Sequence, residues 1–400
     1  MAAAACAFAA PAGGTPSDDE VARAVELLCK IQTNAFHRHD ADLGQVGLFL
    51  EPTLAMANHS CVPNALVRFV GRTAVLVAER PIEAGDEVEI SYTDYTYPLA
   101  QRQQALLPYD FQCCCSRCKD DLNVYQVCAA YPRRDDASSL GLSLVHDLSD
   151  QLGTHPAVID PARRALARTQ GESATRLTES RAESQEVLGE RRRQVLRAQF
   201  RDCSGLVAAG LWAVTPVPQL LTEISIHFAE QGDFATALAV SCFVATVCDP
   251  YRYVACFHPV RAKNIFMIAK LLTNTAEATA GLDDAVQHVT ATVDLDQRIR
   301  ETLRDIDQVS LCQMLLTVVL RLAPTGHAAE WDLTTAAREV LQDIEQLPGR
   351  DKELSLITAW TRDPADDQSR AFFDYAVIQQ VDALAKLGRD VLSFHFDAET

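Results

Sequence analysis

The chain has 400 residues, of which 48% are hydrophobic and 22% charged, a composition typical of a globular protein with two or three domains. Its formal net charge of −18 argues against direct nucleic-acid binding, which requires basic surfaces against phosphate. The same charge is compatible with lysine-rich protein substrates, although an acidic surface also serves solubility alone. No run of 18 or more apolar residues is present, so we expect no membrane-spanning segment.

The cysteine content indicates a reducing compartment. Thirteen cysteines form an odd set without an even framework, which predicts reduced thiols and a cytoplasmic or nuclear location, or both. Cys242, Cys248 and Cys312 stand in apolar surroundings, so we expect them to be buried. The N-terminus has no basic region before Arg23, and a secretory signal is therefore not expected.

The first part of the chain predicts a tail and one helix. Residues 1–16 are rich in Ala, Pro and Gly and are predicted to be a disordered tail. Ser17 is followed by three acidic residues, which is the pattern of a capped helix start. The helical pattern then continues to about Lys30.

Residues 34–118 show short strand patterns instead. The apolar runs at 65–70 and 73–79 are separated by a Gly71-Arg dipeptide, as in a hairpin. A further short strand is predicted at 88–92.

From about residue 120 onward the pattern is almost wholly helical. We interpret 161–199, rich in Arg, Glu and Gln, as a solvated, partly exposed helix or a long linker helix. Later patterns comprise a helix pair over 220–247, a helix over 260–272, and a last helix with Phe373, Val377, Val381 and Leu384 on one face and Gly388 as the expected C-cap. Tandem helical hairpins suggest a repeat-like solenoid, although no clear repeat period is found.

A short cysteine run has the spacing of a zinc site. Zinc prefers four soft ligands in a tetrahedron, and Cys113, Cys115 and Cys118 can supply three of them from one turn. Cys61 is the candidate fourth ligand, and Cys114 should point away. The alternative is a loop of unligated thiols.

Three motifs occur in order around this run. Residues 58–64 read Asn-His-Ser-Cys-Val-Pro-Asn, residues 84–92 read Ala-Gly-Asp-Glu-Val-Glu-Ile-Ser-Tyr, and Phe111 precedes the cysteines. They resemble the signature, the strand ending in tyrosine and the post-SET segment of SET-domain protein-lysine methyltransferases. Residues 34–36 (Asn-Ala-Phe), residues 109–111 (Tyr-Asp-Phe) and the helical C-terminal region resemble the SET-and-MYND group, whose tail is similar to tetratricopeptide repeats.

The resemblance implies an α+β fold. A partial SET β-fold with a post-SET zinc site would be followed by a mostly α-helical, tetratricopeptide-like C-terminal domain. The expected divisions are a partial SET domain with its zinc motif at 17–118, a helical linker region at 119–215 and a repeat-like domain at 216–400. No Gly-x-Gly precedes Asn34, and only Cys6 and Cys29 do. We therefore expect the MYND finger and the N-terminal part of the SET domain, with its cofactor loop, to be missing.

The implied reaction is transfer of a methyl group from S-adenosylmethionine to a lysine of a protein substrate, for which alignment of a neutral amine matters most. The resemblance assigns catalysis to Tyr92, whose hydroxyl would orient the lysine nitrogen. The residues implied to contact the cofactor are Asn34, Asn58, His59, Tyr92 and Phe111, those lining the lysine channel are Phe36 and Tyr109, and those binding structural zinc are Cys61, Cys113, Cys115 and Cys118. An aromatic channel also favours an ammonium group.

Alternative interpretations remain for the single site residues and for the chain as a whole. Asn58 can be a turn cap, His59 a core histidine, and the aromatic residues of the set ordinary packing side chains. The whole chain can be a methyltransferase, intact or truncated in this form, or an inactive SET remnant that acts as a helical scaffold and binds a peptide partner through its C-terminal region.

Overall fold

The computed structural model describes most of the chain, namely residues 16–39, 44–131, 142–145, 148–182, 190–281, 293–323 and 331–397. The predicted disordered tail lies outside the described residues except for Pro16.

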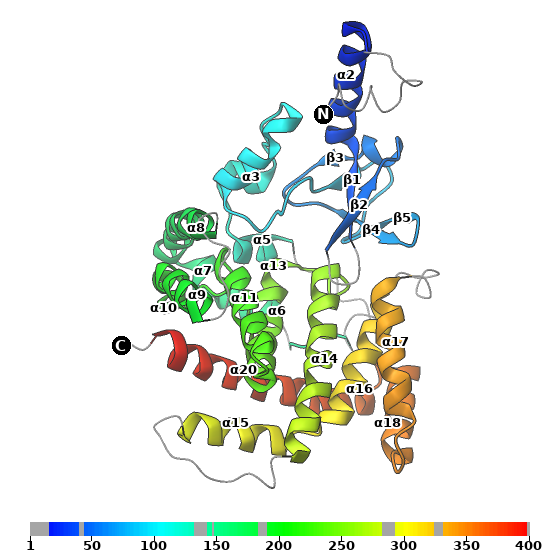
Figure 1. Cartoon of the computed structure of the whole chain (residues 1–400), viewed down its shortest axis with the longest axis vertical. Helices are drawn as coiled ribbons and strands as arrows, with labels where there is room; N and C mark the ends of the chain where they lie inside the picture. Colours follow the sequence, from blue (N-terminus) through cyan, green and yellow to red (C-terminus); the bar gives the residue numbers. More distant parts are fainter. Residues whose placement is uncertain are drawn as a thin grey trace.

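Helix α2 (Asp18–Asn34) begins where the sequence predicts and ends four residues beyond Lys30. The Ser17 hydroxyl accepts a hydrogen bond from the Glu20 N–H, and the Glu20 carboxylate accepts one from the Ser17 N–H, which completes a capping box. The helix buries none of its residues and projects away from the body of the protein (Figure 1).

Six short strands follow in three pairs. They are β1 (Phe36–His39) antiparallel to β2 (Gln45–Phe49), β3 (Asn58–His59) parallel to β6 (Glu89–Ile90), and β4 (Ala65–Val70) antiparallel to β5 (Thr73–Ala78). The β4–β5 hairpin is as predicted, because Gly71 takes the left-handed conformation (φ 55°) that the tight turn needs. The strand predicted at 88–92 is shorter, since the backbone N–H of Tyr92 bonds to a histidine side chain instead of a strand.

One short helix, η1 (Leu54–Met56), lies between β2 and β3, and further short helices connect the strands to the helical region. They are the 3-10 turn η2 (Leu107–Tyr109) and the helices α3 (Leu99–Leu106), α4 (Ser116–Asp120), α5 (Val124–Ala130), α6 (Leu148–Thr154) and α7 (Pro156–Ile159). Next come α8 (Pro161–Ala182), α9 (Glu190–Asp202) and α10 (Ser204–Ala208).

The remaining helices build the bulk of the core. They are α11 (Val217–Glu230), α12 (Phe234–Phe243), the π-helical turn η3 (Val244–Cys248), α13 (Asp249–Arg252), α14 (Pro259–Gly281), α15 (Val293–Asp305), α16 (Gln308–Arg321), α17 (Asp332–Glu345), α18 (Asp351–Arg362), α19 (Asp367–Phe373), the π-helical turn η5 (Asp374–Ile378), α20 (Gln379–Leu392) and the π-helical turn η6 (Ser393–Asp397). Figure 1 shows that α20 crosses behind α11 and α14. A few strands followed by mostly helical structure confirm the α+β prediction.

Two predictions for the helices need correction. The segment 161–199 is not one solvated linker helix, because α8 and α9 pack together and bury Ala167, Ala174 and Leu196. Gly388 is not a C-cap either. It lies inside α20, where a Cβ atom would overlap the Ala239 carbonyl oxygen of α12, so the glycine permits a close helix crossing.

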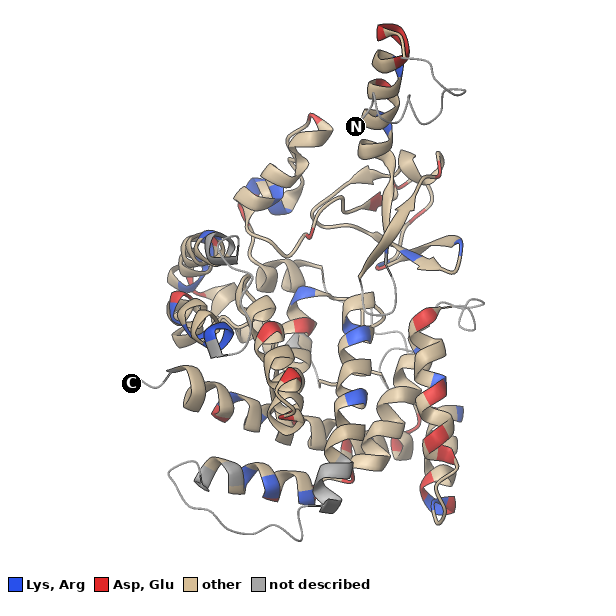
Figure 2. Cartoon of the chain, in the orientation of Figure 1, with Lys and Arg blue, Asp and Glu red and all other residues tan. Residues whose placement is uncertain are grey.

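One contiguous core runs from Val70 to Phe396 and includes buried residues of both predicted helical regions. Cys242, Cys248 and Cys312 are buried free thiols, as predicted. The segment Phe234–Arg252 is long and apolar enough to cross a membrane by length and composition, but 72% of its most apolar window is buried inside the protein, as in a core helix. Figure 2 shows acidic and basic residues interspersed along α17 and α18.

Candidate functional site

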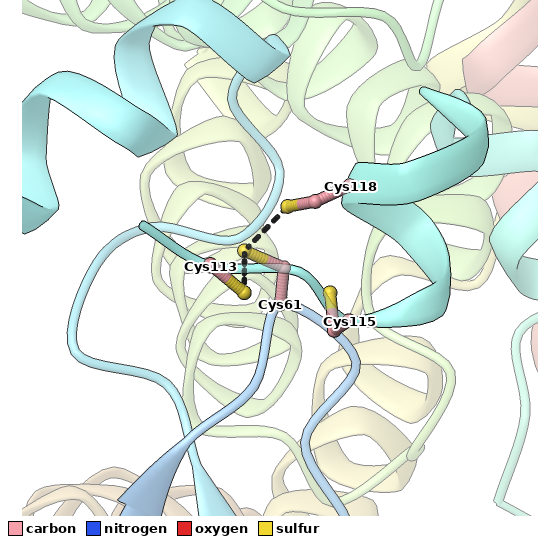
Figure 3. Close-up of side chains that lie close together, drawn as sticks. All are labelled: Cys61, Cys113, Cys115 and Cys118. Atoms are coloured by element: carbon pink, nitrogen blue, oxygen red, sulfur yellow. Dashed lines mark hydrogen bonds between the residues drawn. The ribbon is translucent and has the colours of Figure 1, made fainter. Parts of the chain in front are cut away.

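Four cysteines from three separate segments meet beside α3. Cys61 follows β3, Cys113 and Cys115 lie after η2, and Cys118 lies in α4 (Figure 3). All four Sγ atoms lie within 4.8 Å of one another, and Cys61 Sγ is 4.0 Å from Cys113 Sγ and 3.6 Å from Cys118 Sγ. A tetrahedral zinc ion with Zn–S bonds of about 2.3 Å needs sulfur–sulfur separations of about 3.8 Å. The donor set therefore fits zinc, whereas Cys114 is exposed and outside the cluster.

The surroundings of the cluster suit a negatively charged metal site. The buried Arg102 of α3 donates from Nη2 to Cys118 Sγ at 3.6 Å and also to the Tyr97 carbonyl. Four thiolates around one Zn²⁺ carry a net charge of −2, which a buried guanidinium stabilises. Burial raises the pKa of the Cys113 thiol to about 11, so metal binding would have to displace its proton.

His59 connects the cysteine cluster to Tyr92. Its Nδ1 accepts a hydrogen bond from the Tyr92 backbone N–H at 2.9 Å, and its Nε2 lies 3.3 Å from Cys61 Sγ. Because Nδ1 is an acceptor, the proton of the neutral ring sits on Nε2 and points at the sulfur. Burial lowers the pKa of His59 to about 4, so the ring is neutral at pH 7. Both ring nitrogens are thus engaged within the protein.

Tyr92 stands at the centre of an aromatic cluster. Its hydroxyl donates to the Ala57 carbonyl at 2.6 Å, and its ring centroid is 4.7 Å from that of Tyr109 and 5.2 Å from that of His59. Phe111 joins the cluster at 5.9 Å from the His59 ring. Burial raises the pKa of Tyr92, as do Tyr109 and Glu87, so its hydroxyl stays protonated at neutral pH.

A pocket of about 390 Å³ lies between the strand region and the start of the helical region. Asn34, Phe36, Tyr92 and Tyr109 line it, which brings together four of the predicted site residues. Its lining includes the carboxylates of Glu79 and Asp94 but no Lys or Arg among the described residues. The pocket is therefore electrostatically suited to a cation.

Sequence reasoning missed part of this pocket. Glu79, Tyr95, Tyr253 and His258 also line it. The sequence assigned no site role to any of them, and it marked His258 only as part of a His-Pro pair before an apolar helix, since a carboxylate at the end of a strand and a histidine before a helix look alike in many folds. Their shared position depends on the packing of the helical region against the strands.

Of the other predicted cofactor residues, Asn58, His59 and Phe111 lie outside the pocket lining, whereas Asn34 lies in it. Asn58 is exposed, and its Nδ2 donates to Glu87 Oε1 at 2.5 Å. The Phe111 ring is 39% exposed beside His59, which leaves a face free for stacking. The Asn34 amide donates to the Lys30 carbonyl at 2.8 Å. An open aromatic face and an exposed amide fit part of an adenosyl group, and the role of each residue in cofactor binding stays a prediction.

Buried arginine side chains hold the segment that follows Tyr92 in place. Arg117 donates to the Tyr95 carbonyl, and Arg252 Nη2 donates to Thr96 Oγ1 at 2.9 Å. Thr215 Oγ1 donates to the Thr96 carbonyl at 3.2 Å. The loop after Tyr92 is therefore positioned by the helical region.

Comparisons with known proteins give matches over the strand region of the chain. The model of the SET domain matches residues 18–93. The chain is 40% identical over 95 residues to N-lysine methyltransferase SMYD2-A of Xenopus laevis, covering 24% of this chain and 22% of that protein. It is 36% identical over 106 residues to human N-lysine methyltransferase SMYD2, covering 26% and 24%. It is 38% identical over 95 residues to mouse histone-lysine N-methyltransferase SMYD3, covering 24% and 22%.

Residues 18–93 are thus a SET-type region, and the chain resembles SET-domain lysine methyltransferases of the SET-and-MYND type. The matched segment spans about a fifth to a quarter of the length of these curated relatives. What the relatives catalyse is therefore carried to this chain only as a proposal.

Proposed function

We propose that this chain is a protein-lysine N-methyltransferase that uses S-adenosylmethionine and acts on a histone or another protein. The observation that carries the proposal is the pocket in which Tyr92, Tyr109 and Phe36 stand together with Glu79 and Asp94, without Lys or Arg in the described lining. Aromatic walls and carboxylates attract a lysine side chain. The SET-type match over residues 18–93 supports this reading.

The residues would act mainly by alignment and desolvation. When bound, S-adenosylmethionine supplies a methyl group on a positively charged sulfur. Phe36 and Tyr109 would hold the aliphatic part of the lysine, and the Tyr92 hydroxyl would orient its nitrogen for in-line attack. The Ala57 carbonyl already fixes the Tyr92 hydroxyl at 2.6 Å, so little reorganisation is needed.

Zinc has a structural role in this proposal. Four cysteine ligands leave no open coordination position for a reacting group. Bound zinc would hold Cys61 and Cys113, and through them His59 and the Tyr109–Phe111 segment, beside Tyr92. Free thiols suit a reducing compartment, and we propose a cytoplasmic or nuclear location.

The test of this function is the Tyr92→Phe substitution in the full chain. Calorimetric titration with S-adenosylmethionine should give similar dissociation constants for both proteins, since only one hydroxyl is removed. Transfer of a labelled methyl group to core histones or a lysine peptide library should fall about 100-fold. Tyr251→Phe, whose hydroxyl bonds to Gln151 away from the pocket, is the matched control. Absence of cofactor binding, or full activity of Tyr92→Phe, would refute the proposal.

A second candidate function is a non-catalytic scaffold. A groove of about 600 Å³ lies among α15, α16, α18 and η5, and Leu356 and Tyr375 are exposed in it. Such a groove is the type of surface that helical repeat proteins use for peptides. This function predicts that a fragment starting near residue 120 folds and captures a peptide partner. An unfolded fragment would contradict it.

A further inference from the structure

We infer that Glu79, with Tyr95, Tyr253 and His258, forms a second cation subsite in the pocket, which selects protein substrates that carry an arginine or a lysine near the target lysine. The inference rests on the proposed function, because it names the class of substrate that the same pocket would take. The four residues are called the Glu79 subsite below.

Glu79 is placed rigidly in the pocket wall. It follows β5 directly, and its backbone N–H donates to the Asn64 carbonyl at 2.8 Å. Asn64 is itself fixed, since its amide donates to the Glu87 carbonyl and accepts from the Glu89 N–H, both at 2.8 Å. Within the described part of the chain, the Glu79 carboxylate has no hydrogen bond or ion pair, yet it lines the pocket. An acceptor group is therefore available to a ligand.

Aromatic rings stand beside this carboxylate. The Tyr95 ring centroid lies 6.1 Å from that of Tyr253 and 6.2 Å from that of His258, and the last two rings stack at 4.2 Å. Glu79 and Tyr95 line the same pocket, and the charge of Glu79 contributes, after burial, to the raised pKa of Tyr95. Aromatic faces with a nearby carboxylate are the usual surroundings of a bound ammonium or guanidinium group.

The neighbouring arginines donate hydrogen bonds to backbone carbonyls. Arg68 donates to the carbonyls of Leu322 and Phe257, and Arg80 donates to the Val62 carbonyl at 2.9 Å. Neither arginine lines the pocket. Burial lowers the pKa of His258 to about 3, so this ring is neutral and does not repel a cation.

The subsite is separate from the group that would hold the target lysine. Tyr92 packs on Tyr109, whereas Tyr95, three residues further along the same segment, packs on Tyr253 and His258, so two aromatic groups are built on this segment. Both groups line the same pocket. A substrate with two cationic side chains can therefore occupy both.

The test uses the full chain and short alanine-based peptides with one central lysine and a single arginine moved through the flanking positions. Methyl transfer and, separately, binding of fluorescent peptides by anisotropy are measured for the wild type, Glu79→Gln and Glu83→Gln. Glu83 is an exposed glutamate further along the β5–β6 loop that does not line the pocket, which makes it the matched control. Melting curves show whether the variants fold.

In the wild type and in Glu83→Gln, arginine at one position should raise binding and transfer about 10-fold over the arginine-free peptide. In Glu79→Gln this ratio should fall towards one. An equal ratio in all three proteins, or no arginine preference in the wild type, overturns the subsite. If no peptide is methylated, the proposed function fails, and the anisotropy ratio still decides the subsite.

Measuring the arginine preference in binding over a range of pH values distinguishes loss of the Glu79 charge from loss of structure. Burial raises the pKa of Glu79 to about 7. The arginine preference in binding should therefore grow between about pH 6 and pH 8 as the carboxylate ionises, and it should stay flat in Glu79→Gln. The other titratable or charged groups facing Glu79 are Arg68, Arg80, Asp94, Tyr95, Tyr253 and His258, and they are common to both proteins. A preference in the wild type that does not change with pH would contradict the role of Glu79.

Discussion

At the scale of single residues, His59 joins two features that the sequence shows as separate motifs. One ring nitrogen faces the sulfur of Cys61 and the other accepts from the backbone of Tyr92. A change in the cysteine cluster is therefore transmitted directly to the segment that carries the proposed catalytic hydroxyl. The neutral ring is needed for this, because only a neutral histidine can donate on one side and accept on the other.

The cysteine cluster gives a prediction at this scale. Cys115→Ser should weaken zinc binding more than about 100-fold, because one of the four sulfur ligands is lost. Cys114→Ser, one residue away and exposed, should bind zinc as the wild type does. Zinc content by elemental analysis after dialysis against a chelator checks both, and about one zinc ion per chain is expected in the wild type. Equal zinc retention by the two variants would exclude the four-cysteine site.

At the scale of elements, the crossing of α12 and α20 organises the helical region. Gly388 lies where α20 meets the Ala239 backbone of α12, and a Cβ atom there would also stand 3.1 Å from Phe243 Cβ. Residues 239 and 243 are one helical turn apart, so the glycine fits between two consecutive turns of the facing helix. From the sequence alone, the same glycine is expected to end a helix.

Gly388→Ala should therefore destabilise the protein. The added methyl group has to push two backbones apart, which costs about 1–3 kcal/mol of unfolding free energy. Gly153→Ala is the matched control, since its added Cβ meets nothing within 4 Å and alanine favours helix α6. Urea denaturation measures the free energy of unfolding of both variants. Equal stability of the two would show that α12 and α20 do not cross closely at this glycine.

At the scale of the whole molecule, a buried arginine links the strands to the helical region. Arg68 of β4 reaches Leu322 at the end of α16 with an N–O distance of 3.2 Å and also donates to the Phe257 carbonyl. Its guanidinium carbon lies 4.5 Å from the ring centroid of Trp331. The pocket is lined from both sides of this junction, so its shape depends on how the two parts are held together.

Arg68→Met keeps the aliphatic stem of the side chain and removes the charged hydrogen bonds. A buried carbonyl and a partly buried one lose their donor, so the free energy of unfolding should fall by about 2–4 kcal/mol. Arg72→Met, at the exposed hairpin turn, should change it by less than about 0.5 kcal/mol. Denaturant titration measures both values. Wild-type stability of Arg68→Met would show that the junction is held by apolar packing alone.

The sequence by itself determined the features that depend on neighbours along the chain. The capped start of α2 at Ser17, the β4–β5 hairpin at Gly71 and the four-cysteine set follow from local chemistry or from motifs with fixed spacing. The resemblance of residues 18–93 to SET-type proteins was also visible there, because its motifs occur in order. Such local patterns and motifs can be recognised without the tertiary structure.

The tertiary structure alone decided the features that depend on segments far apart in the chain. Glu79 and His258 share one pocket wall although 179 positions separate them in the numbering, and Gly388 meets Ala239 across two helices. These contacts come from packing, and many sequences with the same local pattern would pack differently. The charge of the pocket, and with it the substrate that we infer, is therefore a property of the folded chain.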